Sequence, residues 1–234
     1  MIYKDGCMKC GEVLIYLEEI VDKNCSLCGN LKAANALCRN DHFVCDTCHT
    51  GNFDDIVKNI CLETTETDMI KLLNKIRMHP SMPLHGPEHH FAIASVIVAT
   101  YKNLGGKIDF ENALDTAIER GKQIPGGTCG FWGGCGAALG SGIGMGILIE
   151  SNPLKPKQRQ ELAKITGEII QSISMFKSAR CCRRETITAL KTVASLSETH
   201  LNLILKAEGN SNCGQFKKNE ECPEDECPYY VINE

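Results

Sequence analysis

The chain has 234 residues, of which 43% are hydrophobic and 23% charged, and its formal net charge is −4. A globular protein of this length has one sizeable core, or one core and a small appended module. The mildly acidic balance gives no general attraction to nucleic acid or anionic membranes, although it does not exclude a local basic patch. We therefore expect a small-molecule substrate or a partner enzyme, with nucleic acid as the weaker alternative.

No export signal or membrane span is apparent in the sequence. The N-terminal residues lack the apolar core of a signal peptide, and the longest apolar stretch, 91–100, is far shorter than the about 20 residues a spanning helix needs. We therefore expect a cytoplasmic protein with no membrane partner. Because thiols stay reduced in that compartment, the 15 cysteines favour metal ligation or thiol chemistry over disulfides.

The first 48 residues contain seven cysteines and a suitably spaced histidine, which form four ligand pairs. A C-x2-C turn directs both sulfurs at one centre, as tetrahedral zinc requires. The predicted metal ligands are Cys7, Cys10, Cys25, Cys28, Cys38, His42, Cys45 and Cys48. They suffice for two zinc ions in a zinc-ribbon or treble-type module over residues 1–53. An iron–sulfur cluster is the alternative if the histidine is not a ligand.

The spacing leaves the pairing of these ligands open. Consecutive pairing joins the first pair with the second and the third with the fourth, whereas interleaved pairing joins the first with the third and the second with the fourth. His49 is an alternative to His42. Four protein ligands leave no open position, so the module should be structural. Its folding energy should come largely from the metal, because so short a segment cannot build a sufficient core.

From residue 54 onward the hydrophobic pattern is helical. Apolar residues at helical spacing, with caps and glycine stops, predict helices at 68–77, 91–104, 109–120, 157–176 and 184–196, and a helical extension at 201–205. Strand patterns are scarce. The sequence therefore predicts a mainly α protein, with an all-α domain over residues 54–207 and a cysteine-containing tail over residues 208–234 that packs on it.

Three histidines and a carboxylate lie within residues 85–90 at a predicted loop-to-helix junction. Near the positive end of a helix dipole a carboxylate stays ionised and imidazoles resist protonation. A neutral imidazole is what a general base or a metal ligand requires. We therefore predict catalytic roles for His85, Glu88 and His89, with a polar helix cap as the simpler alternative.

Residues 126–146 are dense in glycine and contain Cys129 and Cys135. Such density favours close approach of the backbone to a ligand. The two cysteines are predicted to bind a cofactor such as an iron–sulfur cluster, or to present a thiolate near a helix N-terminus. Anion binding by the glycine turn and close helix packing through a glycine face are the alternatives.

Two further cysteine groups occur near the C-terminus. Cys181 and Cys182 are flanked by Arg180, Arg183 and Arg184, which favour thiolate, so we predict catalytic roles for both cysteines. The same arginines are also suited to bind a phosphate or carboxylate at the helix start, and a buried structural thiol beside solvated arginines is the remaining alternative. Cys213, Cys222 and Cys227 lie in the polar tail, and a proline follows the last. Proline after cysteine recurs in iron–sulfur ligand runs, so these three are predicted cofactor ligands.

In chain order these motifs read CRNDHFVCDTCH, HGPEHH, CGFWGGCGAA, RCCRR and ECPEDECPYY. Together they resemble an uncharacterised family of cysteine-rich metalloproteins from anaerobic archaea and bacteria, over nearly the whole chain. Members of that family occur fused to, or encoded near, methyltransferase-like or radical-type enzymes. The resemblance implies a metalloprotein of anaerobic metabolism and assigns no catalytic residue.

Three functions fit these patterns. The first is an iron–sulfur or thiolate-dependent enzyme for sulfur transfer, desulfuration or lyase-type chemistry, in which a [4Fe–4S] cluster with one open iron acts as a Lewis acid. The second is a zinc-finger adaptor for a protein or nucleic acid; nucleic acid is disfavoured because residues 1–50 have five Lys/Arg against seven Asp/Glu. The third is a metal or cluster carrier for a partner enzyme. The surplus of cysteines outside the finger favours the enzyme.

Overall fold

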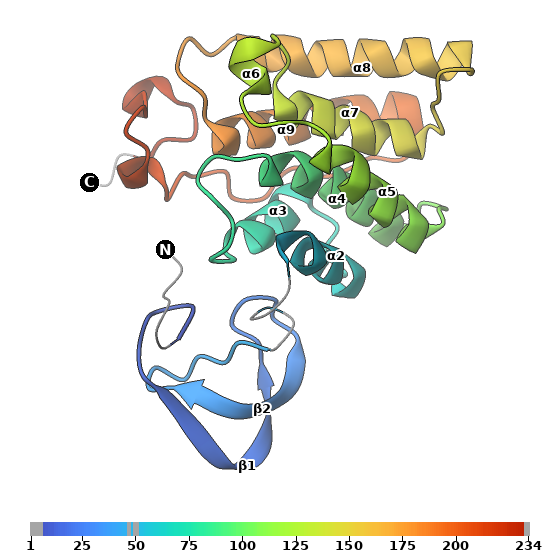
Figure 1. Cartoon of the computed structure of the whole chain (residues 1–234). Helices are drawn as coiled ribbons and strands as arrows, with labels where there is room; N and C mark the ends of the chain where they lie inside the picture. The colour runs from blue at the N-terminus through green and yellow to red at the C-terminus, as the bar shows by residue number, and fades with distance from the viewer. Residues whose placement is uncertain (1–6, 46–47, 49–51, 232–234) are drawn as a thin grey trace.

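The structure, a computed structural model, describes residues 7–45, 48 and 52–231 (Figure 1). The strands are β1 (Leu14–Asn24) and β2 (Leu31–Cys38). The helices are α2 (Phe53–Glu63), α3 (Met69–Arg77), α4 (Glu88–Asn103), α5 (Phe110–Lys122), α6 (Thr128–Phe131), α7 (Gly136–Leu148), α8 (Pro156–Ser174) and α9 (Cys182–Leu201), followed by two 3-10 turns, η1 (Phe216–Lys218) and η2 (Glu224–Glu226). The predicted combination of an N-terminal metal-ligand module with an all-α body is confirmed.

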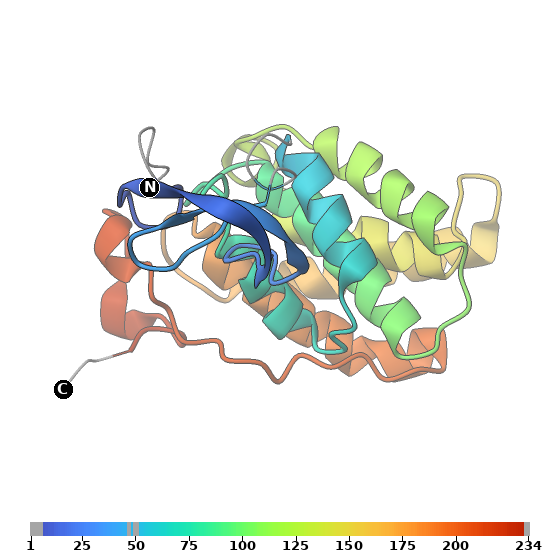
Figure 2. The same cartoon turned by 90° about the horizontal axis from the view of Figure 1, so that it is seen from below.

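The N-terminal module is built on an antiparallel hairpin that lies at one side of the body (Figures 1 and 2). β1 and β2 pair along their lengths, with an irregularity between Tyr16 and Val21. The first cysteine pair lies in the turn of residues 7–10 before β1, and the second lies in the turn of residues 25–28 between the strands. Both faces of β1 are largely exposed, so neither face needs to be apolar. The sequence therefore lacks the alternation of apolar and polar residues that would predict these strands.

The helix α4 is the centre of the body, and every residue from His89 to Thr100 on it is buried. It packs against α5 and α7 and also contacts α2, α3 and α9, while α8 covers α7 and α9 on the side away from the hairpin (Figure 1). A helix enclosed on all sides needs apolar residues around its whole circumference, as residues 91–104 have. Neither α4 nor any other helix in the described residues is long and apolar enough to cross a membrane.

The glycine-rich stretch is divided between a turn with the short helix α6 and the long helix α7. The expectation of a ligand-binding glycine loop is therefore wrong for residues 136–148, where the glycines let α7 pack closely on α4 and α8. A Cβ atom added at Gly140 would lie 2.3 Å from the backbone carbonyl oxygen of His90. Only glycine permits this approach of two helix backbones, because neither backbone can move aside alone.

We expect Gly140→Ala to lower the free energy of unfolding by about 1–3 kcal/mol, because the added methyl group overpacks the contact between α7 and α4. Gly167→Ala is the matched control, since Gly167 is an exposed residue of α8 whose added Cβ would have no neighbour within 4 Å. There the better helix propensity of alanine should raise stability by about 0.5–1 kcal/mol. Urea denaturation followed by circular dichroism measures the change in the free energy of unfolding for both substitutions. Equal effects of the two substitutions would contradict the packing argument.

The helix α9 ends at Leu201, because Asn202 adopts the left-handed conformation with a φ of 50°. The predicted helical extension over residues 201–205 is therefore wrong. Asparagine is one of the few residues other than glycine that readily takes this conformation, and it commonly ends a helix.

The C-terminal segment runs back along the body after α9 (Figure 2). Lys206 forms an isolated parallel bridge with Asp68, the residue before α3. Near the other end of the segment Tyr229 is buried, and its hydroxyl oxygen lies 3.1 Å from that of Thr188 on α9. The segment therefore contacts the body at both ends. The division of the chain into residues 1–53, 54–207 and 208–234 stays a prediction.

Candidate metal centres and active-site cavity

The eight predicted ligands of the N-terminal module form two groups of four, and within each group the ligand atoms all lie within 4.8 Å of one another. The first group is Cys7, Cys10, Cys38 and His42, and the second is Cys25, Cys28, Cys45 and Cys48. The structure thus has the interleaved pairing and not the consecutive one. The antiparallel hairpin explains this pairing of ligands. It places the start of β1, which follows the first cysteine pair, beside the end of β2, where the third ligand pair begins. His49 lies outside the described residues.

The spacing of the sulfur atoms matches tetrahedral coordination. The Sγ atoms of Cys10 and Cys38 are 3.8 Å apart, and those of Cys28 and Cys45 are 3.9 Å apart. A tetrahedron with metal–sulfur bonds of about 2.3 Å has neighbouring sulfurs about 3.8 Å apart. The Nδ1 atom of His42 lies 3.3 Å from the Sγ atom of Cys10 and completes the first group. Each group can therefore hold one metal ion.

The second ligand group also joins the module to the helical body. Its four cysteines are buried in one continuous core with residues of α2 and α3. The Nε2 atom of His79, which follows α3, donates to the backbone carbonyl oxygen of Cys48 at 3.2 Å. The ring of His79 also lies 5.9 Å from that of Phe53 at the start of α2. The metal group nearer the body is therefore part of the packing that holds the module in place.

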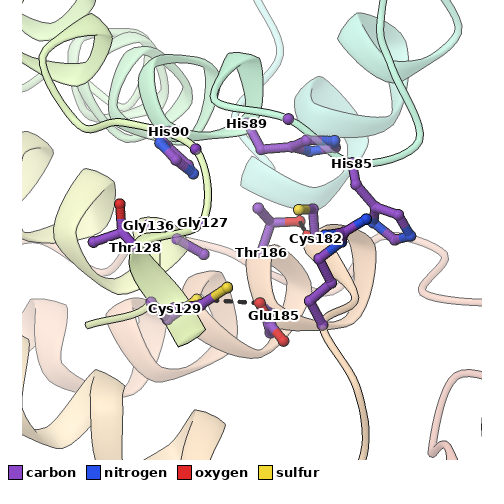
Figure 3. A pocket seen from close by; sticks show the side chains of 15 residues that line it. His85, His89, His90, Gly127, Thr128, Cys129, Gly136, Cys182, Glu185 and Thr186 are labelled. Atoms are coloured by element: carbon purple, nitrogen blue, oxygen red, sulfur yellow. Dashed lines mark hydrogen bonds between the residues drawn. The ribbon is translucent and has the colours of Figure 1, made fainter. Parts of the chain in front are cut away.

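A cavity of about 210 Å³ lies where the first turns of α4, α7 and α9 converge, and α6 closes one side (Figure 3). We call it the histidine–cysteine cavity. Its lining residues are His85, Gly86, His89, His90, Gly126, Gly127, Thr128, Cys129, Cys135, Gly136, Ala137, Arg180, Cys182, Glu185 and Thr186. A helix start carries free N–H groups and the positive end of the helix dipole. Three such ends at one cavity favour an anionic ligand there.

His89 uses both of its ring nitrogens within the protein. Its Nε2 atom donates to the carbonyl oxygen of Pro83 at 3.1 Å, and its Nδ1 atom accepts from the guanidinium of Arg77 at 3.1 Å. Burial and the charge of Arg77 keep the pKa of His89 well below its usual value. A neutral imidazole with both nitrogens occupied has no atom left to exchange a proton with a substrate. The geometry therefore supports a positioning role for His89, not the predicted catalytic one.

His85 and His90 each keep one nitrogen without a protein hydrogen bond among the described residues. The Nε2 atom of His85 donates to the Oδ1 atom of Asn219 at 3.0 Å, which leaves its Nδ1 atom buried and unpaired. The Nδ1 atom of His90 donates to the carbonyl oxygen of Ile124 at 3.1 Å, and its Nε2 atom lies against Gly136 at the start of α7. Burial lowers the pKa of His90, so its free nitrogen is unprotonated near neutral pH.

Three thiols line the histidine–cysteine cavity, and they differ in access. The Cys135 thiol donates to the Oε2 atom of Glu185 at 3.2 Å, and burial followed by the charge of Glu185 raises the pKa of Cys135. Burial raises the pKa of Cys182 to about 11. Cys129 is the one exposed cysteine of the chain, whose cysteines all lie in described residues, and it also lines an adjoining hollow of about 560 Å³. An incoming molecule therefore meets Cys129 first.

Cys181 lines a different cavity from its neighbour Cys182. Cys181 is the extended N-cap residue of α9 and Cys182 is its first helical residue, so their side chains diverge. Cys181 lines a second cavity, here called the four-cysteine cavity, together with Cys213, Cys222 and Cys227. The predicted catalytic pair is thus divided. The predicted cofactor ligands are divided as well, because Cys129 and Cys135 line the first cavity and the three tail cysteines line the second.

One polar residue of the histidine–cysteine cavity, Glu185, was not predicted to be functional, and one predicted residue, Glu88, lines neither cavity. Glu185 lies one turn into α9, where a carboxylate is ordinary because it favours the helix dipole. Glu185 and its partner Cys135 are 50 residues apart in the sequence, so no local sequence pattern could predict their hydrogen bond. Glu88, in contrast, does not line the cavity, and its side chain folds back over Gly86.

A family model described as "Family of unknown function (DUF5714)" matches residues 57–230. The matched region contains the residues that line both cavities and begins after the ligands of the N-terminal module. No curated protein and no solved structure matches the chain. The anaerobic origin implied by the motifs stays a prediction. The match spans most of the chain, which therefore belongs to this family of unknown function, DUF5714.

Proposed function

We propose that this protein is a sulfur-transfer enzyme with a structural two-zinc module. In this proposal the helical body binds a small anionic sulfur compound in the histidine–cysteine cavity, and Cys129 is the thiol that takes up the sulfur atom. The observation that carries the proposal is the convergence of three helix starts on one cavity whose wall contains three thiols (Figure 3).

The choice of zinc for the N-terminal module is supported by the donor set and the sulfur spacing. One group has three thiols and an imidazole and the other has four thiols, with sulfur separations of 3.8 Å and 3.9 Å. Both sets are common in structural zinc sites. Four protein ligands leave no coordination position for a substrate, so the two ions would stabilise the fold and would not take part in the reaction.

The preference for a small anion is supported by the charges around the cavity. Besides the three helix starts, Arg180 lines both the cavity and the adjoining hollow. The one carboxylate in the lining, Glu185, already accepts hydrogen bonds from the Cys135 thiol, the backbone N–H of Cys181 and the Arg184 guanidinium. Thiosulfate and small persulfides are anions that suit a cavity of about 210 Å³.

The proposed reaction needs no outside oxidant. The sulfur of Cys129 attacks the outer sulfur of a persulfide donor, R–S–SH. A new S–S bond forms as the donor S–S bond breaks, and the thiol proton passes to the departing sulfur, giving Cys129–S–SH and R–SH. An acceptor thiol then removes the outer sulfur by the same exchange. His90 has a neutral nitrogen at the cavity that is suited to carry the proton between the two sulfurs.

The test is sulfur transfer by the full-length protein, purified with its metals under anaerobic conditions. We expect cysteine persulfide to leave one extra sulfur atom on the peptide that contains Cys129, as measured by mass spectrometry, and a thiol acceptor to remove it. In Cys129→Ser the rate of transfer should fall on the order of a thousandfold, because the oxygen nucleophile cannot hold the transferred sulfur.

Trp132→Ala is the control for damage to α6, since Trp132 is an exposed neighbour of that helix and does not line the histidine–cysteine cavity. Its rate should stay within about twofold of the unsubstituted protein. Full transfer by Cys129→Ser, or no sulfur on Cys129 with either cysteine persulfide or thiosulfate, would refute the proposal.

One observation favours the second candidate function, an adaptor for a protein partner. The strand β1 exposes several large apolar side chains, of which Tyr16 is 78% and Ile20 71% exposed. Apolar residues gathered on one exposed hairpin are a common feature of protein-binding surfaces. An adaptor would bind its two metal ions and transfer no sulfur, so the experiment above separates the two functions.

A further inference from the structure

We infer that Cys181, Cys213, Cys222 and Cys227 ligate a [4Fe–4S] cluster in the four-cysteine cavity. This site is separate from the histidine–cysteine cavity and from the two metal groups of the N-terminal module. The inference does not depend on the sulfur-transfer proposal, because none of its four ligands lines the histidine–cysteine cavity.

The first support is that segments distant in sequence bring four thiols to one cavity. Cys181 comes from the start of α9, whereas the other three come from the C-terminal segment. Each of those three donates a backbone hydrogen bond: Cys213 to the carbonyl oxygen of Tyr229 at 2.7 Å, Cys222 to that of Asn219 at 3.1 Å, and Cys227 to that of Glu224 at 2.9 Å. Cys213 and Cys227 also pack against the hydrophobic core, but packing alone does not require all three tail cysteines to share one space with Cys181, whereas a metal centre does.

The second support is a surplus of buried positive charge around this cavity. Arg183 and Arg184 line it, and Arg77 reaches it through a 2.7 Å hydrogen bond to Gln215, which also lines it. The Nε atoms of all three arginines are buried and have no partner among the described residues. Among the described residues Arg184 forms a salt bridge with Glu185, and neither Arg77 nor Arg183 forms one.

Burying an unpaired donor of a charged side chain raises the free energy of the folded protein. A negatively charged group in the cavity would remove this penalty by accepting hydrogen bonds from these donors. Four thiolates around a [4Fe–4S] core carry a net negative charge and supply sulfur acceptors for such donors. Such a centre would supply acceptors for the unpaired Nε atoms of these arginines, each of which already has a protein partner at another guanidinium nitrogen.

The third support concerns a cluster as opposed to a single zinc ion. These four cysteines do not form a group with all sulfurs within 4.8 Å of one another, as the two ligand groups of the module do. Ligands of a cluster lie farther apart than ligands of one ion, because each binds a different iron atom. Pro228 follows Cys227, as in many cluster ligand runs.

The four-cysteine cavity is nearly closed in this structure. Only about 20 Å³ of it admits the centre of a water molecule. Cluster binding therefore needs the loop cysteines of the tail to turn outward slightly. The apolar walls, which include Leu84, Phe216 and Tyr230, would then shield the cluster from water.

The position of His85 connects the two cavities. His85 lines both of them, and its Nδ1 atom is one of the buried nitrogens without a partner. A cluster in the four-cysteine cavity would thus be separated from the histidine–cysteine cavity by the His85 side chain.

The test is metal and sulfide analysis of the full-length protein, purified without oxygen. We expect about four iron atoms and about four acid-labile sulfides per chain beside about two zinc ions, with an electron paramagnetic resonance signal after reduction by dithionite. In Cys227→Ala the iron, the sulfide and the signal should be lost while the zinc and the helical circular dichroism signal stay, the latter showing that the helical body is folded. About three zinc ions with no iron or sulfide in the unsubstituted protein would overturn the inference.

Cys129→Ser is the matched control, since Cys129 lines only the other cavity and its outer hollow. It should keep the full iron and sulfide content. Loss of iron and sulfide in Cys129→Ser, with retention in Cys227→Ala, would place the cluster elsewhere and refute this assignment. The iron content of Cys227→Ala tests the cluster, whereas the transfer rate of Cys129→Ser tests the proposed reaction, so either can fail alone.

Discussion

Substitution of one ligand of the second metal group, Cys28→Ser, should release one of the two metal ions and unfold the N-terminal module. The apparent binding free energy of a structural zinc ion is about 10–16 kcal/mol and supplies most of the folding energy of a module this small. The group of Cys28 also packs against α2 and α3, so the contact between module and body is lost with it. We expect zinc content to fall from about two ions to about one, and limited proteolysis to cleave within residues 25–45.

Cys61→Ser is the matched control for this effect. Cys61 is completely buried on α2 and belongs to neither metal group. Its replacement adds a buried hydroxyl and should lower stability by about 1–3 kcal/mol, but both metal ions should stay bound. If Cys28→Ser kept two zinc ions and its resistance to protease, the second metal group would not be a metal site.

Asp68→Ala should lower the free energy of unfolding by about 3–5 kcal/mol, the largest effect we expect of any residue outside the metal groups. The side chain is 4% exposed and accepts four backbone hydrogen bonds. Two come from Ile70 and Lys71 in the first turn of α3, and two come from Glu208 and Gly209 in the C-terminal segment. One carboxylate thus caps a helix and fastens the segment that carries Cys213. Urea denaturation measures the loss, and proteolysis reports release of the segment.

Asp109→Ala is the control, since Asp109 is also an N-cap aspartate, at the start of α5, but makes no capping hydrogen bond through its side chain. Its substitution should cost less than about 0.5 kcal/mol. Equal losses for the two aspartates would show that Asp68 acts only through general helix propensity and does not anchor the segment.

Local patterns in the sequence determined where most of the helices lie and which residues group as metal ligands. Helices such as α3 and α8 follow from apolar residues three and four apart, because this spacing depends on the chain nearby. The same holds for the C-x2-C turns, whose two sulfurs meet through a short stretch of backbone. The helix α7 was not predicted, because its glycines are required by the backbone of α4 and the side chains of α8, which lie close to it.

The tertiary structure alone decided how the chemical groups are combined. The interleaved metal groups depend on the pairing of β1 with β2, and the contact between Cys135 and Glu185 depends on how α7 packs against α9. Cys181 and Cys182 are adjacent in sequence yet line different cavities, because one precedes the first turn of α9 and the other begins it. The sequence determined the set of chemical groups, since residue types and short spacings are local. Their assignment to two metal groups and two cavities required the fold, since each of these sites joins residues that are far apart along the chain.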